Sequence, residues 1–175
     1  AQQAAQAKSE GSHYIVKRMD VFNSHRADYS PMYFGDDHNK LYFSSTRNEA
    51  KGDALSGITG AKPADIFVSE RDDKGKWSKP EPVQGGLNTE YDEGACTFSP
   101  DQRTMYFTQC TTDPNYPRYA QVMTSARSDA AWAKATKLDI SKDTLSSFAH
   151  PAVSPDGQWL YFVSDMPGGQ GGQDL

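Results

Sequence analysis

The chain has 175 residues, 36% of them hydrophobic and 23% charged, which suits one soluble domain or two small ones. A net charge of -5 offers no basic face for a phosphate backbone and argues against nucleic acid as a partner. Neither an apolar run of about 18 residues nor the layout of a signal peptide is present, so we expect a cytoplasmic chain or a processed or excised piece of a longer one.

Aromatic residues and turn formers dominate the pattern, with 9 Tyr, 8 Phe and 3 Trp beside 14 Gly and 10 Pro. This mixture favours many short strands separated by turns. Residues 1–12 are rich in Ala and Gln without apolar periodicity and are predicted to be a linker or the end of an upstream helical region. Residues 13–22 (HYIVKRMDVF) are predicted to be the closing strand of an earlier or incomplete unit.

Three segments share one plan of a short apolar strand, a polar turn and a second strand with an aromatic pair. They begin at Asp28, Asp92 and Phe148, and their pairs are Tyr42-Phe43, Tyr106-Phe107 and Tyr161-Phe162. The Phe residues of the pairs lie 64 and then 55 positions apart (107 − 43 and 162 − 107). A repeat of that size is typical of solenoids and propellers.

The first two segments continue alike, which extends the repeat beyond the hairpin. A third strand is predicted at Asp65–Glu70 and a fourth one opening at Trp77, and the second unit repeats this design with Trp132. Four antiparallel strands per unit are the blade of a β-propeller. We therefore predict an all-β fold, a partial β-propeller over 13–175 with four-stranded antiparallel blades at about 28–83 and 92–140 and an incomplete one at 148–175.

The last unit breaks off early in this alignment. Asp174-Leu175 corresponds to Asp65-Ile66, so its third strand only begins. Since propellers typically have about 4 to 8 blades, we expect the chain to be part of a longer protein. The junctions before the hairpins also match, with Asn23-Ser24 aligned to Asn88-Thr89 and Asp28 to Asp92. Such side chains tighten corners by bonding to nearby backbone.

The two cysteines flank the second hairpin, whose turn is predicted near Ser99 to Thr104. Cys110 should then lie across from residue 92 or 93, which puts Cys96 three or four residues out of register. At about 3.3 Å per residue that exceeds the reach of a disulfide without distortion. Two separate thiols are the favoured interpretation, and a disulfide is the alternative.

No catalytic, metal-binding or cofactor-binding residue is predicted. The Gly-rich stretches at 52–60 and from Gly168 lack the Lys-Ser/Thr of a P-loop, and no Gly-x-Ser-x-Gly elbow occurs. The four histidines are scattered, without the spacing of a zinc site. A weak candidate for protein binding is the stretch TTDPNYPRYA with Tyr116, Arg118 and Tyr119, because Tyr and Arg on a long loop suit a binding surface. A loop anchored by its own aromatic residues is an equal alternative.

The segments SPDGQWLYFVSD and GGQGGQDL resemble the TolB-type, WD-like β-propeller repeat of bacterial envelope proteins. In that repeat a Ser-Pro-Asp-Gly turn joins two strands and a Gly-rich loop leads to an Asp-Leu/Ile third strand. The segments YIVKRMDVFNS, SGITGAKPADIF, DEGACTFSPDQRTMYF and DMPGGQGGQDL are more narrowly similar to the propeller of the PorW/SprE lipoproteins of the type IX secretion system of Bacteroidota. The chain departs from this pattern in having neither the lipid-bearing N-terminal Cys nor a clear tetratricopeptide repeat.

This resemblance implies a non-enzymatic, protein-interaction component of the type IX secretion and gliding machinery. It implies a lipoprotein on the periplasmic side of the outer membrane, anchored through a lipid outside this chain. Its partners would be proteins of the translocon and the periplasmic ring or motor, without a cofactor. Two alternatives remain: the propeller domain of a prolyl-oligopeptidase-type hydrolase, and a glycan- or peptidoglycan-associated envelope propeller.

Overall fold

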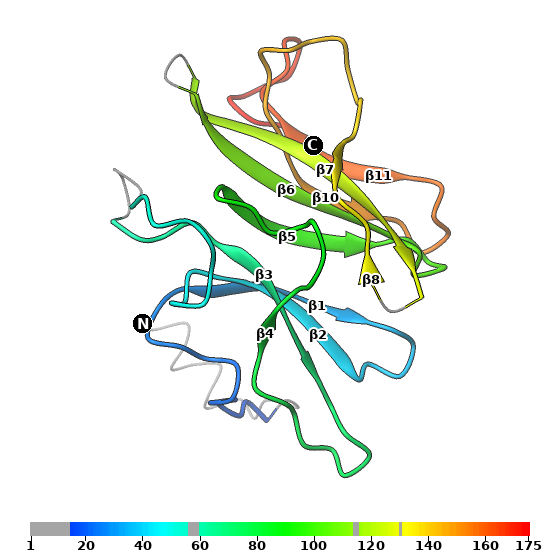
Figure 1. The fold of residues 1–175 in the computed structure, drawn as a ribbon. Helices are drawn as coiled ribbons and strands as arrows, with labels where there is room; N and C mark the ends of the chain where they lie inside the picture. Colours follow the sequence, from blue (N-terminus) through cyan, green and yellow to red (C-terminus); the bar gives the residue numbers. More distant parts are fainter. Residues whose placement is uncertain (1–14, 56–59, 114–115, 130) are drawn as a thin grey trace, which may run out of the picture.

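The computed structural model describes residues 15–55, 60–113, 116–129 and 131–175, and of residues 112, 113 and 116–118 it describes the backbone alone. Over these residues the chain is all-β, without a helix, and every pairing between its strands is antiparallel. The strands form three sheets that lie one beyond another (Figure 1). The predicted linker at 1–12 falls outside the described residues.

The first sheet has the order β1-β2-β3-β4. Its strands are β1 (Asp28–Phe34), β2 (Lys40–Ser45), β3 (Asp65–Glu70) and β4 (Glu81–Pro82). The prediction for the third strand is confirmed, but the fourth strand does not open at Trp77, which makes only an isolated bridge to Arg71. Pro80 and Pro82 have no N–H to donate to a ladder, which keeps β4 short and late.

The second sheet contains β5 (Asp92–Phe98), β6 (Thr104–Asp113), β7 (Tyr116–Ser128), β8 (Ala131–Trp132) and β9 (Thr136–Lys137). Both β8 and β9 pair with β7, at different places along it. The prediction of a long loop around Tyr116 is wrong. Strands β6 and β7 continue to pair there, with Thr111 opposite Tyr119 and Asp113 opposite Tyr116. Thr and Tyr have high strand propensity, which favours this extension.

The third sheet pairs β10 (Phe148–Val153) with β11 (Leu160–Ser164). Ser164 and Asp174 exchange two backbone hydrogen bonds of 2.9 Å, in the position where Ser45 pairs with Asp65 in the first sheet. The predicted alignment of Asp174 with Asp65 is therefore confirmed. The predicted turn from Ser99 to Thr104 is also present, since the Ser99 N–H donates to Thr104 O at 2.9 Å.

The predicted closing strand at 13–22 is not a strand over its described part, residues 15–22. A strand needs a ladder partner, and here the segment instead ends in a turn closed by the Phe22 N–H and Met19 O at 3.1 Å. The Phe22 ring packs on Trp77 at 5.2 Å and on Phe43 at 6.1 Å between centroids. The segment thus covers the outer face of the first sheet.

The first hairpin of each of the three repeats carries the same β-bulge in its first strand. The register shifts at Tyr29/Met32, Gly94/Thr97 and Ala149/Ala152. At each shift one residue has a left-handed φ: Ser30 at 52°, Ala95 at 49° and His150 at 53°. Left-handed φ is uncommon outside glycine. Its recurrence at the same position of all three repeats shows that the bulge is a repeated feature of this fold.

The bulges correct one predicted alignment. Two residues before the bulge stand Asp28 in the first unit and Glu93, rather than Asp92, in the second. The hydrogen bonds agree, because Ser24 donates to Asp28 and Thr89 donates to Glu93, each from four residues earlier. The carboxylate four residues after the Ser or Thr is therefore the repeated feature of these corners.

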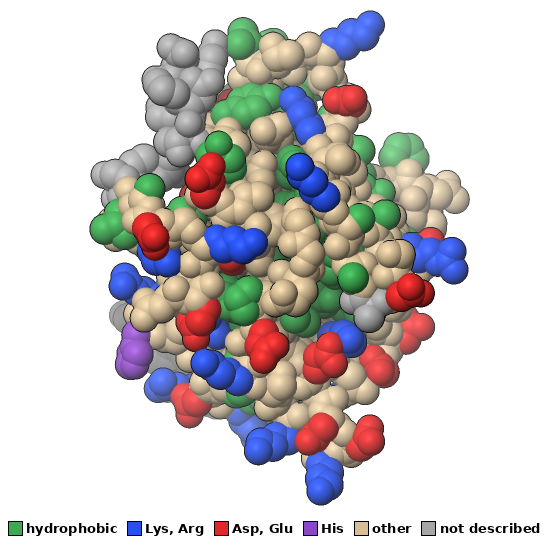
Figure 2. All heavy atoms as spheres, viewed as in Figure 1, with side chains coloured by type: hydrophobic (Ala, Val, Ile, Leu, Met, Phe, Trp, Pro, Cys, Tyr) green, Lys and Arg blue, Asp and Glu red, His purple; other side chains and the backbone are tan. Residues whose placement is uncertain are grey.

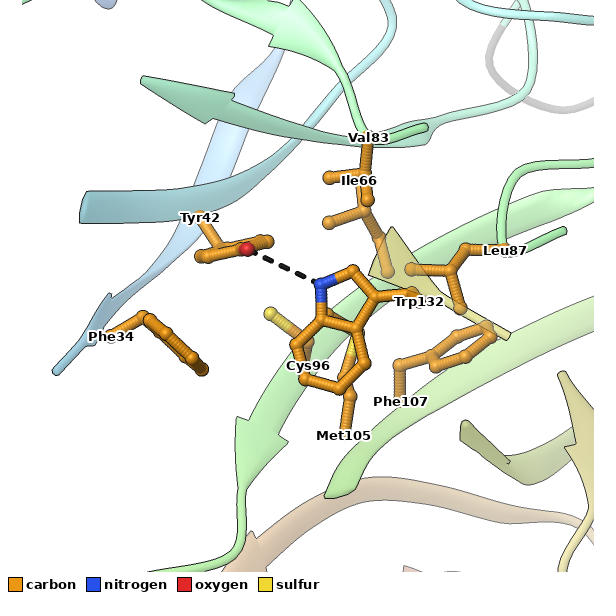
Figure 3. Packing of buried hydrophobic residues seen from close by; sticks show 9 residues of the cluster. All are labelled: Phe34, Tyr42, Ile66, Val83, Leu87, Cys96, Met105, Phe107 and Trp132. Atoms are coloured by element: carbon orange, nitrogen blue, oxygen red, sulfur yellow. Dashed lines mark hydrogen bonds between the residues drawn. The ribbon is translucent and has the colours of Figure 1, made fainter. Parts of the chain in front are cut away.

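The larger hydrophobic core lies between the first and second sheets (Figure 3). In it the Trp132 Nε1–H donates to the Tyr42 hydroxyl at 3.2 Å, across 90 residues of sequence. The members of this core are Phe34, Tyr42, Ile66, Val83, Leu87, Cys96, Met105, Phe107 and Trp132. A smaller core of Leu41, Phe43, Ala50 and Phe67 fills the opposite face of the first sheet.

The cysteines are separate thiols, as the sequence favours. Asp92 lies opposite Cys110 in the ladder, which confirms the predicted register, and no disulfide joins Cys96 to Cys110. Cys96 lies in the larger core, and burial raises the pKa of its thiol to about 12.

Charged side chains of both signs are interspersed over the face drawn in Figure 2.

Within the described residues no helix is long and apolar enough to cross a membrane.

Candidate functional site

A pocket of about 180 Å³ lies where the three bulges meet. Each bulge belongs to an edge strand of its sheet, namely β1, β5 or β10. These three edge strands pack side by side. The lining residues are Ser30, Pro31, Met32, Ala95, Cys96, His150 and Pro151. One repeat position, used three times, therefore builds one site.

Hydrogen bonds between the sheets hold the bulges in place. The N–H of the bulge residue Ala95 donates to Ser44 Oγ of the first sheet at 3.2 Å. The N–H of the bulge residue His150 donates to Thr108 Oγ1 of the second sheet at 2.8 Å. Ser44 directly follows the aromatic pair of β2, and Thr108 directly follows that of β6. The same hydrogen bond from a bulge N–H to this hydroxyl, called the latch below, therefore joins the first sheet to the second and the second to the third.

The sheets approach closely at the first latch. A Cβ atom on Gly94 would lie 2.5 Å from Ser44 Oγ and 3.2 Å from Ser44 Cβ, so a side chain at this position would have to displace the Ser44 side chain. Glycine leaves room for the Ser44 hydroxyl that accepts from the Ala95 N–H.

The chemical character of the pocket is neutral and mostly apolar. Among the described residues that line it there is no Asp, Glu, Lys or Arg. Its polar side chains are the Ser30 hydroxyl and the imidazole of the exposed His150. The Cys96 thiol stays protonated near neutral pH because of its burial, and a thiol in that state is a weak nucleophile and a weak ligand.

A second pocket, of about 190 Å³, lies between the segment Met19–Asn23 and strands β1 and β2. Arg47 fastens that segment to the sheet: its guanidinium donates to Phe22 O and to Asp28 Oδ1, each at 2.7 Å, and lies over the Phe43 and Phe67 rings. Burial raises the pKa of Asp28, but hydrogen bonds from Ser45, Arg47 and Ser24 outweigh it, so the net pKa lies below the ordinary range.

Two buried carboxylates lie at the junction of the first and second sheets. Glu93 is fully buried and accepts hydrogen bonds from Thr89 and from Gln109 Nε2 at 2.9 Å. Its backbone N–H donates to Ala64 O at 2.7 Å, which places it beside Asp65 on the facing strand. Burial, with the charge of Asp65 as a further cause, raises the pKa of Glu93 to about 7.

The predicted binding residues lie elsewhere, on the β6–β7 hairpin. Tyr116 and Arg118 belong to β7, and their side chains fall outside the description. The Tyr119 hydroxyl accepts a hydrogen bond from Lys137 Nζ at 3.1 Å, and that ammonium also lies 5.6 Å from the ring centroid. Tyr119 does not line the bulge pocket, and the binding role of these three residues stays a prediction.

Sequence reasoning missed the bulge pocket, although one signal for it exists. Pro31 and Pro151 stand inside predicted strands, and proline inside a strand marks an edge or a bulge. Of the four histidines, His150 lines the bulge pocket, and His13 falls outside the described residues. Over the described part of the chain, no three His, Cys, Asp or Glu side chains gather as a metal site.

In comparisons with known proteins, no family model and no curated protein matches the chain.

Proposed function

We propose that the chain is part of a β-propeller that acts as a non-enzymatic platform for protein binding. The architecture supports the propeller through the side-by-side packing of β1, β5 and β10, each carrying the same bulge. In a propeller the first strand of every blade lies closest to the central axis, so successive first strands are neighbours. A four-stranded antiparallel first sheet is the expected form of one blade.

Exposed aromatic and apolar side chains support the role in binding. Trp159 and Leu145 are each more than half exposed, at 64% and 62%. Aromatic residues are enriched at the anchor points of protein interfaces. The single observation that carries the proposal is the side-by-side packing of the bulged strands β1, β5 and β10, which is the arrangement expected of successive propeller blades.

The cellular setting follows the sequence resemblance. The protein would be a lipoprotein on the periplasmic side of the outer membrane and a component of the type IX secretion and gliding machinery. Its partners would be proteins of the translocon and of the periplasmic ring or motor. The propeller would present its loops rigidly, while force and gating would belong to the partners.

Co-purification of the full-length protein from its native outer membrane tests this proposal. An affinity-tagged copy is cross-linked, solubilised and recovered, and proteins enriched over an untagged strain are identified by mass spectrometry. Translocon, ring or motor proteins are expected among them. Recovery of the tagged protein with none of these components would overturn the secretion proposal.

A further inference from the structure

We infer that the bulge pocket binds one uncharged aromatic side chain of a partner protein. This inference rests on the proposed function, which it makes more specific by naming the kind of residue that the partner inserts. The pocket is defined by the seven lining residues given above.

The edges around the pocket are unsuited to binding a partner as an added strand. Strand addition needs a regular row of free N–H and C=O groups, and bulges interrupt such a row in all three edge strands. Pro31 and Pro151 also lack an N–H directly after the bulge residues Ser30 and His150. A partner therefore has to be held through a side chain that enters the pocket.

The size of the pocket suits a single ring. This pocket is open to solvent and its volume of about 180 Å³ leaves room for one ring, since an enclosed cavity of about 150 Å³ holds benzene in another protein. A whole peptide segment or a drug-sized ligand needs a pocket of about 300 Å³ or more.

The lining selects an aromatic and uncharged group. A buried ion needs a partner of opposite charge, and no charged side chain is among the described residues that line the pocket. The thioether of Met32 can make the favourable sulfur contacts that aromatic rings offer. The Ser30 hydroxyl and the His150 imidazole supply hydrogen-bonding groups for a phenol O–H or an indole N–H.

Titrations of the 175-residue chain with small probes test the pocket, with the Ala95 methyl signal as the reporter. Indole and phenol are the aromatic probes, cyclohexanol is the non-aromatic probe of similar size, and butylammonium is the charged one. We expect saturable shifts with indole and phenol, and binding at least about tenfold weaker with the other two. Absence of saturable shifts with the aromatic probes, or equal binding of cyclohexanol, would overturn the inference.

Two matched pairs of variants locate the binding. Met32 lines the pocket and its neighbour Tyr33 does not, although both are exposed on β1. Met32→Trp fills the pocket and Met32→Glu places a charge in it, so each is expected to weaken indole binding by about tenfold or more. Tyr33→Trp and Tyr33→Glu should leave binding unchanged, and thermal unfolding confirms that each variant is folded. Equal effects at both positions would place the binding elsewhere and contradict the proposal.

The same variants in the full-length protein separate this inference from the proposed function. Loss of the co-purified partners with Met32→Glu, but not with Tyr33→Glu, is the expected result. If partners are recovered equally with both, the pocket is not their anchor, although the platform function stands. If the wild-type protein recovers no partner, the proposed function fails, whatever the probes show at the pocket.

Discussion

At the scale of single residues, the least usual feature is the pair of carboxylates inside the junction between the first and second sheets. Asp65 and Glu93 are both 0% exposed. Asp65 Oδ2 accepts from the Lys51 N–H at 3.0 Å, whereas Oδ1 has no hydrogen-bond partner among the described residues. Burial raises the pKa of Asp65 as well, with Lys51 and Lys62 opposing the rise. Two buried like charges destabilise the ionised junction.

Stability should therefore fall as the pH rises toward neutrality. The pKa of Glu93 is about 7 in the folded chain against an ordinary 4.5, so its protonated form favours folding. The contribution of Glu93 to the free energy of unfolding, about 3 kcal/mol, is fully present below about pH 4.5. It is lost as the pH rises through 7. Glu93→Gln removes this dependence, and urea unfolding between pH 5 and 8 measures it.

The exposed residue Glu90 provides the control for this experiment. Glu90→Gln is expected to give a curve parallel to that of the wild type, while the curve of Glu93→Gln diverges upward as the pH rises. Parallel curves for Glu93→Gln and the wild type would show that Glu93 does not titrate in this range.

At the scale of elements, the bulged first strand of each hairpin is the unit that joins the sheets. The bulge turns one N–H away from its own ladder, and that N–H reaches a hydroxyl on the sheet before it. Both hydrogen bonds are partly buried, and a bond of this kind contributes about 0.5–1.5 kcal/mol. The left-handed φ of Ala95 and His150 has a conformational cost. A hydrogen bond that a regular strand could not make offsets this cost.

Thr108 tests this latch with two conservative substitutions. Thr108→Val keeps the shape and removes the acceptor for the His150 N–H, so we expect a loss of about 0.5–1.5 kcal/mol in the free energy of unfolding, because this hydrogen bond is only partly buried. Thr108→Ser retains the hydroxyl and is expected to lose clearly less. Hydrogen exchange at the His150 amide should become faster in Thr108→Val alone. If Val and Ser have equal effects, the hydroxyl does not hold the third sheet.

At the scale of the whole molecule, the same tyrosine of the repeat meets three different environments. Tyr42 is 5% exposed between the first and second sheets, Tyr106 is half-buried beside the third sheet, and Tyr161 is 55% exposed. The difference follows the stacking of the sheets, because the second sheet packs on the first and the third packs on the second. In the proposed propeller a further blade would cover Tyr161.

This gradient predicts unequal costs for one substitution at equivalent positions. Tyr42→Ala opens a cavity in the larger core and leaves the Trp132 N–H without its acceptor. We therefore expect a loss of about 3–5 kcal/mol in the free energy of unfolding. Tyr161→Ala removes a side chain that is mostly in solvent and should cost about 1 kcal/mol or less. Chemical denaturation followed by circular dichroism measures both, and similar losses would contradict the stacking described here.

The sequence by itself determined the local elements of this protein. The hairpin from Ser99 to Thr104, the strand Asp65–Glu70 and the alignment of Asp174 with Asp65 follow from turn residues and alternation, which act over a few neighbouring positions. Predictions failed where strands end or lack a partner, as at residues 15–22 and at the β6–β7 hairpin, because pairing depends on what lies alongside.

Only the tertiary structure decided the site. Ser30, Ala95 and His150 have no common residue type, and the local signal of a proline after the bulge residue is present in the first and third units but missing in the second. Their meeting around one pocket depends on three sheets packing in order, and the burial of Glu93 depends on the same contact. Hydrogen bonds and turns of short range are encoded locally, whereas a pocket shared by three repeats exists only after the sheets have packed.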